Sequence, residues 1–181
     1  MQNAPHKKCE GILANLVCLF GGRRDIIFTM AKQDGLINQS SHGIAQKSEI
    51  LVMDDQIERH DLFLRFIGNG FDSVYTAETM LTLMENGQVN AKVLFWDHDL
   101  GSNMKGSEMV KAMIAQNIEL PTVKRIYVHS ANLAGNRMMV EDLQQHYPNI
   151  ITSMAPISWL NDEFQNMKRD KEAFKTFLIG D

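Results

Sequence analysis

Cysteine, proline and glycine are scarce in this chain. Its 181 residues include two cysteines, four prolines and twelve glycines. These counts exclude a disulfide-stapled fold and a collagen-like helix. Both cysteines, Cys9 and Cys18, lie in the first twenty residues, so the rest of the chain has no thiol for catalysis, zinc binding or a disulfide. This cysteine usage predicts a protein of the reducing cytoplasm.

Long apolar runs and an excess of positive charge are also lacking. No stretch approaches the roughly 18 apolar residues of a membrane span, which excludes an integral membrane protein. Residues 49–181 carry twelve Lys and Arg against nineteen Asp and Glu, a net charge of −7. A broad basic surface for nucleic acid is therefore not expected. Hydrophobic residues make up 44% of the chain, which is enough to bury the core of one ordinary domain.

Residues 1–48 differ from the rest of the chain. Their apolar run at 11–20 follows a basic segment, as in a signal peptide, but arginines stand where a cleavage site would lie. The segment Ser40–Gly43 has the composition of a linker. We therefore expect a partly disordered N-terminal extension over residues 1–48 and a folded domain over residues 49–181.

From residue 49 onward, short apolar runs alternate with segments of helical spacing. The runs predict five strands, at residues 50–53, 71–76, 91–96, 123–128 and 150–154. The segments between and after them predict five helices, at 56–67, 78–86, around 109–114, at 133–146, and from a cap at Asn161 or Asp162 to about Leu178. This alternation predicts an α/β fold with a doubly wound parallel sheet.

Polar residues follow three of the predicted strands at the point where each strand ends. Asp54 and Asp55 follow the first strand, the segment 97–99 follows the third, and His129 and Ser130 follow the fourth. In doubly wound sheets the functional crevice lies beyond the carboxyl ends of the strands. We therefore expect acidic, imidazole and hydroxyl groups to converge at one edge of the sheet.

The acidic residues at these strand ends suit a divalent cation. Asp54, Asp55 and Asp97 supply the hard oxygen ligands that Mg²⁺ or Mn²⁺ prefers. Three crowded carboxylates repel one another unless a cation compensates them. An alternative is that Asp54 and Asp55 cap the following helix. Capping would not explain Asp97 and Asp99, so the sequence favours the metal site.

Two histidines accompany the acids. Beside a metal-bound phosphate, His98 and His129 could act as general acid or base near neutral pH. The alternative for each is a hydrogen-bonded histidine with a structural role. Because side chains alternate along an extended strand, His98 points opposite to Asp97 and Asp99. Of the two histidines, His98 is the one expected to face away from the crevice.

The strand ends resemble a receiver domain, the module of two-component response regulators. In this resemblance Asp54 and Asp55 match the magnesium-binding acids, Asp97 the phospho-accepting aspartate and Ser130 the switch hydroxyl. Two signatures, DHDLG at 97–101 and HSxN beginning at His129, resemble more narrowly the cyclic-phosphate processing receiver family. The resemblance covers residues 49 to about 160. It implies a flavodoxin-like, five-stranded parallel sheet with helices on both faces, and hence a receiver-like domain over residues 49–181.

Two positions depart from the receiver pattern. Signalling receivers place a lysine at the end of the fifth strand, usually before a proline, whereas this chain has Ala155 and Pro156 there. Without the phosphate-gripping lysine, an aspartyl-phosphate switch is disfavoured. The proline that usually follows the HSxN signature is replaced by Leu133, which affects only the loop conformation.

Contacts to a phosphate are expected from several polar residues. The loop 101–106 has a glycine at each end, so its backbone N–H groups could approach an anion. The alternative for this loop is a solvated turn without a ligand. The alternative for Arg59 and Arg137 is a surface ion pair. The residues predicted to bind phosphate or substrate are Arg59, Asp99, Lys105, Ser130, Asn132 and Arg137.

The function predicted from these features is metal-dependent processing of a cyclic or terminal phosphate of RNA or a nucleotide. Asp97 would be nucleophile or metal ligand, and His129 the acid or base. The net charge of −7 favours a small nucleotide or an RNA end over a long duplex as substrate. The sequence does not identify a protein partner.

Three alternatives remain. One is a signalling receiver phosphorylated on Asp97, which the missing lysine disfavours. Another is a non-catalytic module that binds a protein or a cyclic nucleotide. The doublets His98–Asp99 and His60–Asp61 also occur in helical metal phosphohydrolases, but one doublet here ends a predicted strand, and motifs this short recur by chance.

Overall fold

The computed structural model describes residues 47–101 and 103–180, and this part of the chain alternates strands with helices. In chain order, its elements are β1 (Ile50–Met53), α1 (Ile57–Ile67), β2 (Phe71–Val74), α2 (Ala77–Glu85), β3 (Val93–Asp97), α3 (Gly106–Ala115), β4 (Arg125–His129), α4 (Leu133–His146), β5 (Ile151–Met154), α5 (Ile157–Asn166) and α6 (Lys171–Ile179). Nearly all of the predicted N-terminal extension, residues 1–46, lies outside the described residues.

The strands form a parallel sheet in the order β2-β1-β3-β4-β5. This is the strand order of a flavodoxin-like doubly wound sheet, so the fold class predicted from the sequence is confirmed. The chain winds outward from β1 in both directions, and the crevice that such sheets use for ligands opens beside β1 and β3, at their carboxyl ends.

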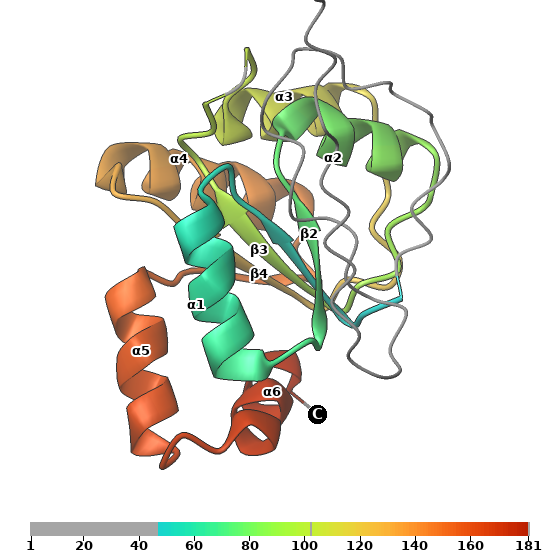
Figure 1. Ribbon diagram of the computed structural model, residues 1–181. Helices are drawn as coiled ribbons and strands as arrows, with labels where there is room; N and C mark the ends of the chain where they lie inside the picture. The colour runs from blue at the N-terminus through green and yellow to red at the C-terminus, as the bar shows by residue number, and fades with distance from the viewer. Residues whose placement is uncertain (1–46, 102, 181) are drawn as a thin grey trace, which may run out of the picture. The chain divides into compact units, whose positions relative to one another are not determined.

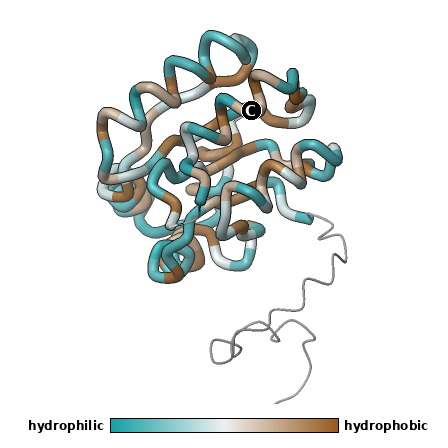
Figure 2. Tube along the Cα trace, turned by 90° about the horizontal axis from the view of Figure 1, so that it is seen from above, coloured by the Kyte–Doolittle hydropathy of each residue, from teal (hydrophilic) through white to brown (hydrophobic). Residues whose placement is uncertain are grey.

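Alternating residues of each strand face two separate cores. Ile50, Val52 and Phe95 pack in the core that α1, α5 and α6 cover. Leu51 and Trp96 pack in the core that α2, α3 and α4 cover. Figure 1 shows these two helical layers on either side of the sheet. In Figure 2 the central strands carry much of the hydrophobic colour, as expected for strands buried on both faces. Successive residues of a strand point to opposite faces of the sheet. A residue at a strand end therefore points to the same face as the residue two positions before it, and we say that the two have the same parity.

The C-terminal helix predicted from the sequence is wrong, because two helices, α5 and α6, stand in its place. Asn161 and Asp162 lie inside α5 and do not cap it, since α5 begins directly after Pro156. Lys168 and Arg169 have φ values of 56° and 61°. This left-handed backbone cannot continue a right-handed helix, so α5 ends before these residues. The Asp170 side chain then accepts hydrogen bonds from two backbone N–H groups and caps α6.

No helix among residues 47–101 and 103–180 combines the length and the apolar character needed to cross a bilayer.

Candidate functional site

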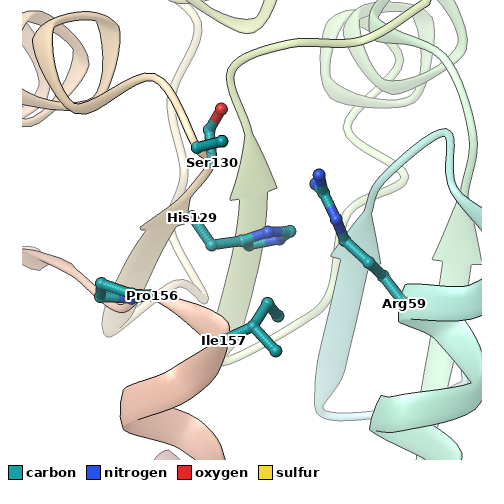
Figure 3. A pocket seen from close by; sticks show the side chains of 6 residues that line it. Arg59, His129, Ser130, Pro156 and Ile157 are labelled. Atoms are coloured by element: carbon teal, nitrogen blue, oxygen red, sulfur yellow. The ribbon is translucent and has the colours of Figure 1, made fainter.

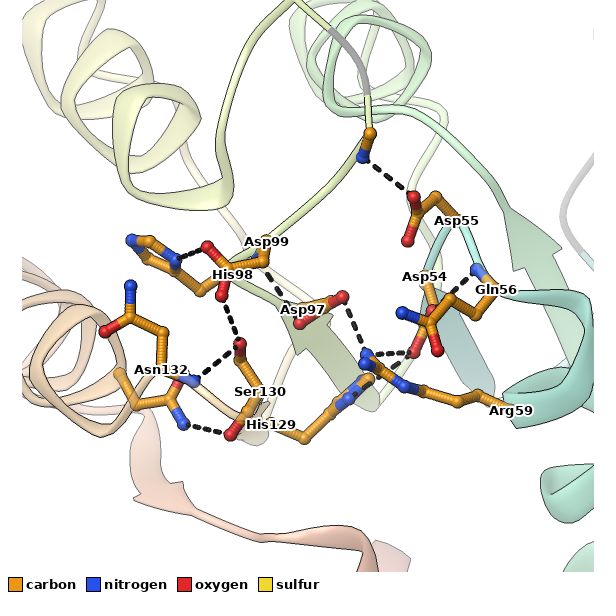
Figure 4. Close-up of polar contacts among 12 residues, drawn as sticks. Asp54, Asp55, Gln56, Arg59, Asp97, His98, Asp99, His129, Ser130 and Asn132 are labelled. Atoms are coloured by element: carbon orange, nitrogen blue, oxygen red, sulfur yellow. Dashed lines mark hydrogen bonds and ion pairs between the residues drawn. The ribbon is translucent and has the colours of Figure 1, made fainter.

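Three strands deliver acidic and imidazole side chains to the same edge of the sheet. Asp97, the last residue of β3, is in register with His129, the last residue of β4. Asp54 and Asp55 directly follow β1, which neighbours β3. One carboxylate oxygen from each of Asp54, Asp55 and Asp97 lies within 4.8 Å of the others (Figure 4). We call these three residues the acid cluster.

Strand parity explains which side chains meet. Asp54 has the parity of Val52, and Asp97 has that of Phe95, so both point to the face of the sheet that α1 covers. His129 shares its parity with Tyr127 and points to the same face. His98 lies one position further along and points toward the other helical layer, as predicted. The prediction that it also points opposite to Asp99 is wrong: β3 ends at Asp97, so strand alternation does not continue, and Nδ1 of His98 lies 2.7 Å from Oδ1 of Asp99.

Arg59, in the first turn of α1, joins two members of the acid cluster. Its Nη1 atom donates to Oδ2 of Asp54 at 3.0 Å and to Oδ2 of Asp97 at 2.7 Å. Only 18% of the Arg59 side chain is exposed, and both carboxylates are fully buried. The sequence predicted a phosphate contact or a surface ion pair for Arg59. The structure places it in a largely buried ion pair with two acids.

The acid cluster is electrostatically unfavourable as it stands. Burial, together with the neighbouring Asp54 charge, raises the pKa of Asp97 to about 6. Burial also raises the pKa of Asp54, although the Gln56 N–H and Arg59 oppose this effect. The single positive charge of Arg59 therefore only partly compensates the three carboxylates. A divalent cation would supply the charge that is missing.

His129 is a fully buried histidine with unused hydrogen-bonding atoms. Its ring packs against both Phe63 and Phe95, with centroid distances of 5.9 Å and 6.3 Å. Neither ring nitrogen has a hydrogen-bond partner among the described residues, and Nδ1 lies 3.6 Å from Oδ2 of Asp54. Burial, and then the charge of Arg59, lowers the pKa of His129 to about 3. The imidazole is therefore neutral at pH 7.

The residues of the acid cluster fit a divalent cation. Oδ2 of Asp55 accepts a hydrogen bond from the Gly101 N–H at 2.8 Å. Its Oδ1 atom is buried and has no partner within the described part of the chain. A Cβ at Gly101 would lie 2.6 Å from Oδ2 of Asp55, so any larger residue there would force the Asp55 carboxylate to shift. Asp55 thus offers one free, oriented oxygen, and carboxylate oxygens are the ligands that Mg²⁺ and Mn²⁺ prefer.

A pocket of about 270 Å³ opens beside the acid cluster (Figure 3), lined by Arg59, His129, Ser130, Ala131, Pro156 and Ile157. Ala155, at the position where signalling receivers carry a lysine, is buried, and its N–H donates to the Val128 carbonyl. A methyl group therefore stands in place of an ammonium group. In the described residues, the cation beside Asp97 comes from α1 and not from the end of β5.

A second group of polar residues lies next to the acid cluster, and we call it the paired cluster: His98, Asp99, Ser130 and Asn132. Nδ1 of His98 lies 2.7 Å from Oδ1 of Asp99, and the Ser130 hydroxyl donates to Oδ2 of Asp99 at 3.0 Å. The Asn132 N–H donates to Oγ of Ser130 at 3.1 Å. Although burial opposes it, hydrogen bonds from His98 and Ser130 lower the pKa of Asp99. The predicted catalytic residue His98 thus belongs to a separate side-chain network, which is joined to the acid cluster by the Asp99 backbone N–H, the donor to Oδ1 of Asp97 at 3.3 Å.

Helix α4 supports the paired cluster. The Asn132 side chain accepts from the Gly135 N–H and caps the helix. A Cβ at Gly135 would lie 2.4 Å from Nε2 of His98, so glycine lets the ring pack against the helix. Asn136, which the sequence reasoning missed, is fully buried and donates to the Ser130 carbonyl at 3.0 Å. The available signal was a polar residue four positions after the Asn132 cap, on the inner face of a predicted helix.

His60 was also missed as a supporting residue. Its Nε2 atom lies 2.7 Å from the Asp54 carbonyl oxygen and must donate to it, and Nδ1 then accepts from the Ser73 hydroxyl at 2.9 Å. His60 therefore fixes the backbone at Asp54. The doublet His60–Asp61 is part of α1 and contributes no side chain to the acid cluster.

Two predicted phosphate contacts lie apart from the site. Lys105 is exposed at the start of α3, and Arg137 is exposed on α4. Within the described residues, no hydrogen bond or ion pair joins either side chain to the acid cluster. In the loop 101–106, Ser102 lies outside the described residues, while the Gly106 N–H donates to the His98 carbonyl at 2.9 Å.

Comparison with known proteins links the site to one family. The model of the cyclic-phosphate processing receiver domain matches residues 49–145, more than half of the chain. This match includes the acid cluster, Arg59, His129 and the paired cluster. No sequence among the curated proteins matches the chain.

Several solved structures are similar to the chain at low identity. NtrX from Brucella abortus is 17% identical with a TM-score of 0.44, and the match covers 70% of this chain but only 27% of NtrX. The signal receiver domain of an HD domain-containing protein from Pseudomonas fluorescens is 13% identical with a TM-score of 0.45, covering 72% and 99% of the two chains. A CheY-like receiver domain from Methanospirillum hungatei is 18% identical with a TM-score of 0.40, covering 70% and 95%.

Proposed function

Because the chain belongs to the cyclic-phosphate processing receiver domain family, we propose that it is a metal-dependent enzyme acting on a cyclic or terminal phosphate of a nucleotide or an RNA end. One observation carries this proposal. Three crowded carboxylates lie beside a buried histidine that has no hydrogen-bond partner in the described residues. Such a site is costly to the fold, and a bound cation and substrate would offset the cost.

The acid cluster would hold the cation. Asp54, Asp55 and Asp97 supply its oxygen ligands, and Mg²⁺ or Mn²⁺ bound there would polarise the phosphoryl oxygens. Arg59 is the nearest protein cation and can pair with a phosphate bidentately. The Ser130 hydroxyl, on the pocket wall, is a further candidate to bind the phosphate.

His129 would move the proton. Opening a cyclic phosphodiester breaks one P–O bond, with water adding a hydroxyl to phosphorus and a proton to the departing oxygen. His129 is neutral at pH 7, so once the bound substrate has raised its pKa it would accept the proton of the attacking water and return it to the departing oxygen. The negative charge of a cyclic phosphate in the pocket would offset the charge of Arg59 and so raise the pKa of His129, which would make the ring a better base in the complex.

The proposed substrate is small or presents a single end. The described residues bring one guanidinium to the acid cluster, and residues 49–181 have a net charge of −7. A long duplex would need several phosphate contacts along a basic surface. A cytoplasmic nucleotide or RNA end needs only one.

The test is turnover of a short RNA that ends in a 2′,3′-cyclic phosphate, in the presence of Mn²⁺. Mass spectrometry should show a product heavier by one water. Asp97→Asn and His129→Ala should abolish the product, whereas Asp61→Asn and His146→Ala, the same substitutions at exposed positions, should retain it.

Absence of turnover in the wild-type protein, with Mn²⁺ bound, would contradict the proposed activity. Labelling of Asp97 by acetyl phosphate would then favour the signalling receiver. Retention of the cyclic end without turnover would favour a binding module.

A further inference from the structure

The ion pair between Arg59 and the acid cluster uses the carboxylates that the proposed cation needs. A single atom, Nη1, contacts Oδ2 of both Asp54 and Asp97, at 3.0 Å and 2.7 Å. The guanidinium therefore lies between two of the three candidate ligands. Figure 4 shows it there, at the centre of the site.

We infer that Arg59 is an exchangeable internal cation: it pairs with Asp54 and Asp97 when no divalent cation is bound, leaves them when one binds, and then binds the phosphate of the substrate. This inference rests on the proposed function in one respect, that the acid cluster binds a divalent cation. It does not depend on turnover.

Electrostatics gives the reason for the exchange. A divalent cation held by Asp54 and Asp97 would lie within a few ångströms of Nη1, and two positive charges at that distance repel strongly in a buried site. The other oxygen of each of these two carboxylates is also engaged, because Oδ1 of Asp54 accepts from the Gln56 N–H at 2.8 Å and Oδ1 of Asp97 accepts from the Asp99 N–H at 3.3 Å. The cation and the guanidinium therefore compete for the same carboxylate charge.

The pocket provides space for the Arg59 guanidinium after it leaves the carboxylates. The side chain lines the 270 Å³ pocket, so there is open space beside the acids that its guanidinium can enter. Figure 3 shows Arg59 and His129 extending toward each other across this pocket. Once Arg59 moves, the unpartnered nitrogens of His129 face the space that a phosphate would enter.

The replacement of the receiver lysine makes a second role for Arg59 necessary. Ala155 supplies no charge at the end of β5, and Lys105 is exposed and makes no ion pair with the cluster in the described residues. In the described residues, Arg59 is thus the protein cation available both to neutralise the acid cluster and to bind the phosphate. A residue that serves two partners in turn must release the first before it binds the second.

Residue-resolved modification by phenylglyoxal tests the exchange in the wild-type protein. Mg²⁺ should increase the modification of Arg59 several-fold, and adding inorganic phosphate to the Mg²⁺ form should reverse the increase. Arg65, which is exposed on the same helix, is the internal control and should not change. Calorimetry on the same sample establishes whether Mg²⁺ binds.

The outcomes separate this inference from the proposed function. If Mg²⁺ binds and Arg59 stays equally protected or becomes more protected, the exchange is wrong while the metal site stands. If Mg²⁺ does not bind, both fail. If Arg59 exchanges but the cyclic-phosphate RNA is not turned over, only the proposed activity fails.

A matched pair of variants gives an independent check. Arg59→Met should bind Mg²⁺ about tenfold more tightly, because the competing cation is gone, and should bind phosphate about tenfold more weakly in the presence of Mg²⁺. Arg65→Met removes the same charge from an exposed position on α1 and should change neither affinity. Unchanged phosphate affinity in Arg59→Met would contradict the second role of Arg59.

Discussion

The acid cluster and the paired cluster lie side by side at one edge of the sheet, yet they differ in burial, in hydrogen bonding and in the direction of their pKa shifts. Asp97 is fully buried, and burial raises its pKa to about 6. Asp99, two residues later, is about half exposed, and its partners lower its pKa. His129 has no hydrogen-bond partner in the described chain, whereas His98 lies 2.7 Å from a carboxylate oxygen.

The contrast indicates different roles for the two clusters. The bonds of the paired cluster join the end of β3 to the start of α4, so it fixes the loop after β4 without any ligand. The acid cluster keeps unsatisfied charge and an unused imidazole in a buried place. Natural proteins retain such costs mainly where function requires them. The difference favours our proposal that the acid cluster is the reactive site, with the paired cluster supporting it.

The largest expected effect is on metal affinity. Asp97→Asn removes a predicted ligand and should weaken Mn²⁺ binding at least about 100-fold, since even outer-shell partners of a metal cost 10–100-fold. Asp99→Asn, the matched substitution in the paired cluster, should change the affinity by less than about threefold. Mn²⁺ titration followed by electron paramagnetic resonance measures both. Equal losses in the two variants would remove the distinction between the clusters.

The next effect is on stability and concerns the histidines. Because the folded-state pKa of His129 is lowered to about 3, the fold loses stability as pH falls below 6.5, when the unfolded chain binds a proton that the folded ring refuses. His129→Leu removes this loss. The unfolding free energy of the variant minus that of the wild type should therefore increase by about 2 kcal/mol when the pH is lowered from 7 to 5.

Urea unfolding at the two pH values measures this advantage. His98→Leu should instead lower the stability at pH 7 by about 1 kcal/mol, because Oδ1 of Asp99 loses the imidazole as its partner. A constant difference between His129→Leu and the wild type would contradict the neutral, buried His129.

A smaller effect is the pH dependence of metal binding. The pKa of Asp97 is about 6, so below that pH a proton occupies the carboxylate that the cation needs. The Mn²⁺ affinity should fall about tenfold between pH 7 and pH 5. Calorimetric titration at both pH values checks this. An affinity that does not change with pH would show that Asp97 is not a ligand.

The smallest effect is the cost of disturbing the paired cluster. Asp99→Asn weakens the bonds from His98 and Ser130, and because Asp99 is half exposed we expect a loss of only about 0.5–1 kcal/mol in unfolding free energy. Thermal and urea unfolding measure it. A gain in stability would mean that Asp99 is also a strained, functional acid.

The sequence predicted the fold better than the details of the site. Apolar runs and their polar ends predicted all five strands because buried parallel strands are continuous in sequence. The last helix was wrong, since the cap at Asp170 and the left-handed residues before it are local features that periodicity does not reveal.

Within the site, strand-end position predicted which acids converge, and parity predicted that His98 points away from Asp97. Partners on other elements were not predictable. The ion pair of Arg59 with both Asp54 and Asp97 depends on how α1 lies over β1 and β3. The support from Asn136 depends on how α4 approaches β4. Such contacts are set by tertiary packing, which a single sequence does not specify.

The measurement that tests the central claim most directly is a crystal structure of the protein soaked in Mn²⁺, with anomalous diffraction to locate the ion. The account predicts an anomalous peak enclosed by carboxylate oxygens of Asp54, Asp55 and Asp97, with none at Asp99. A crystal that shows no peak at the acid cluster, while Arg59 still bridges Asp54 and Asp97 at saturating Mn²⁺, would contradict it.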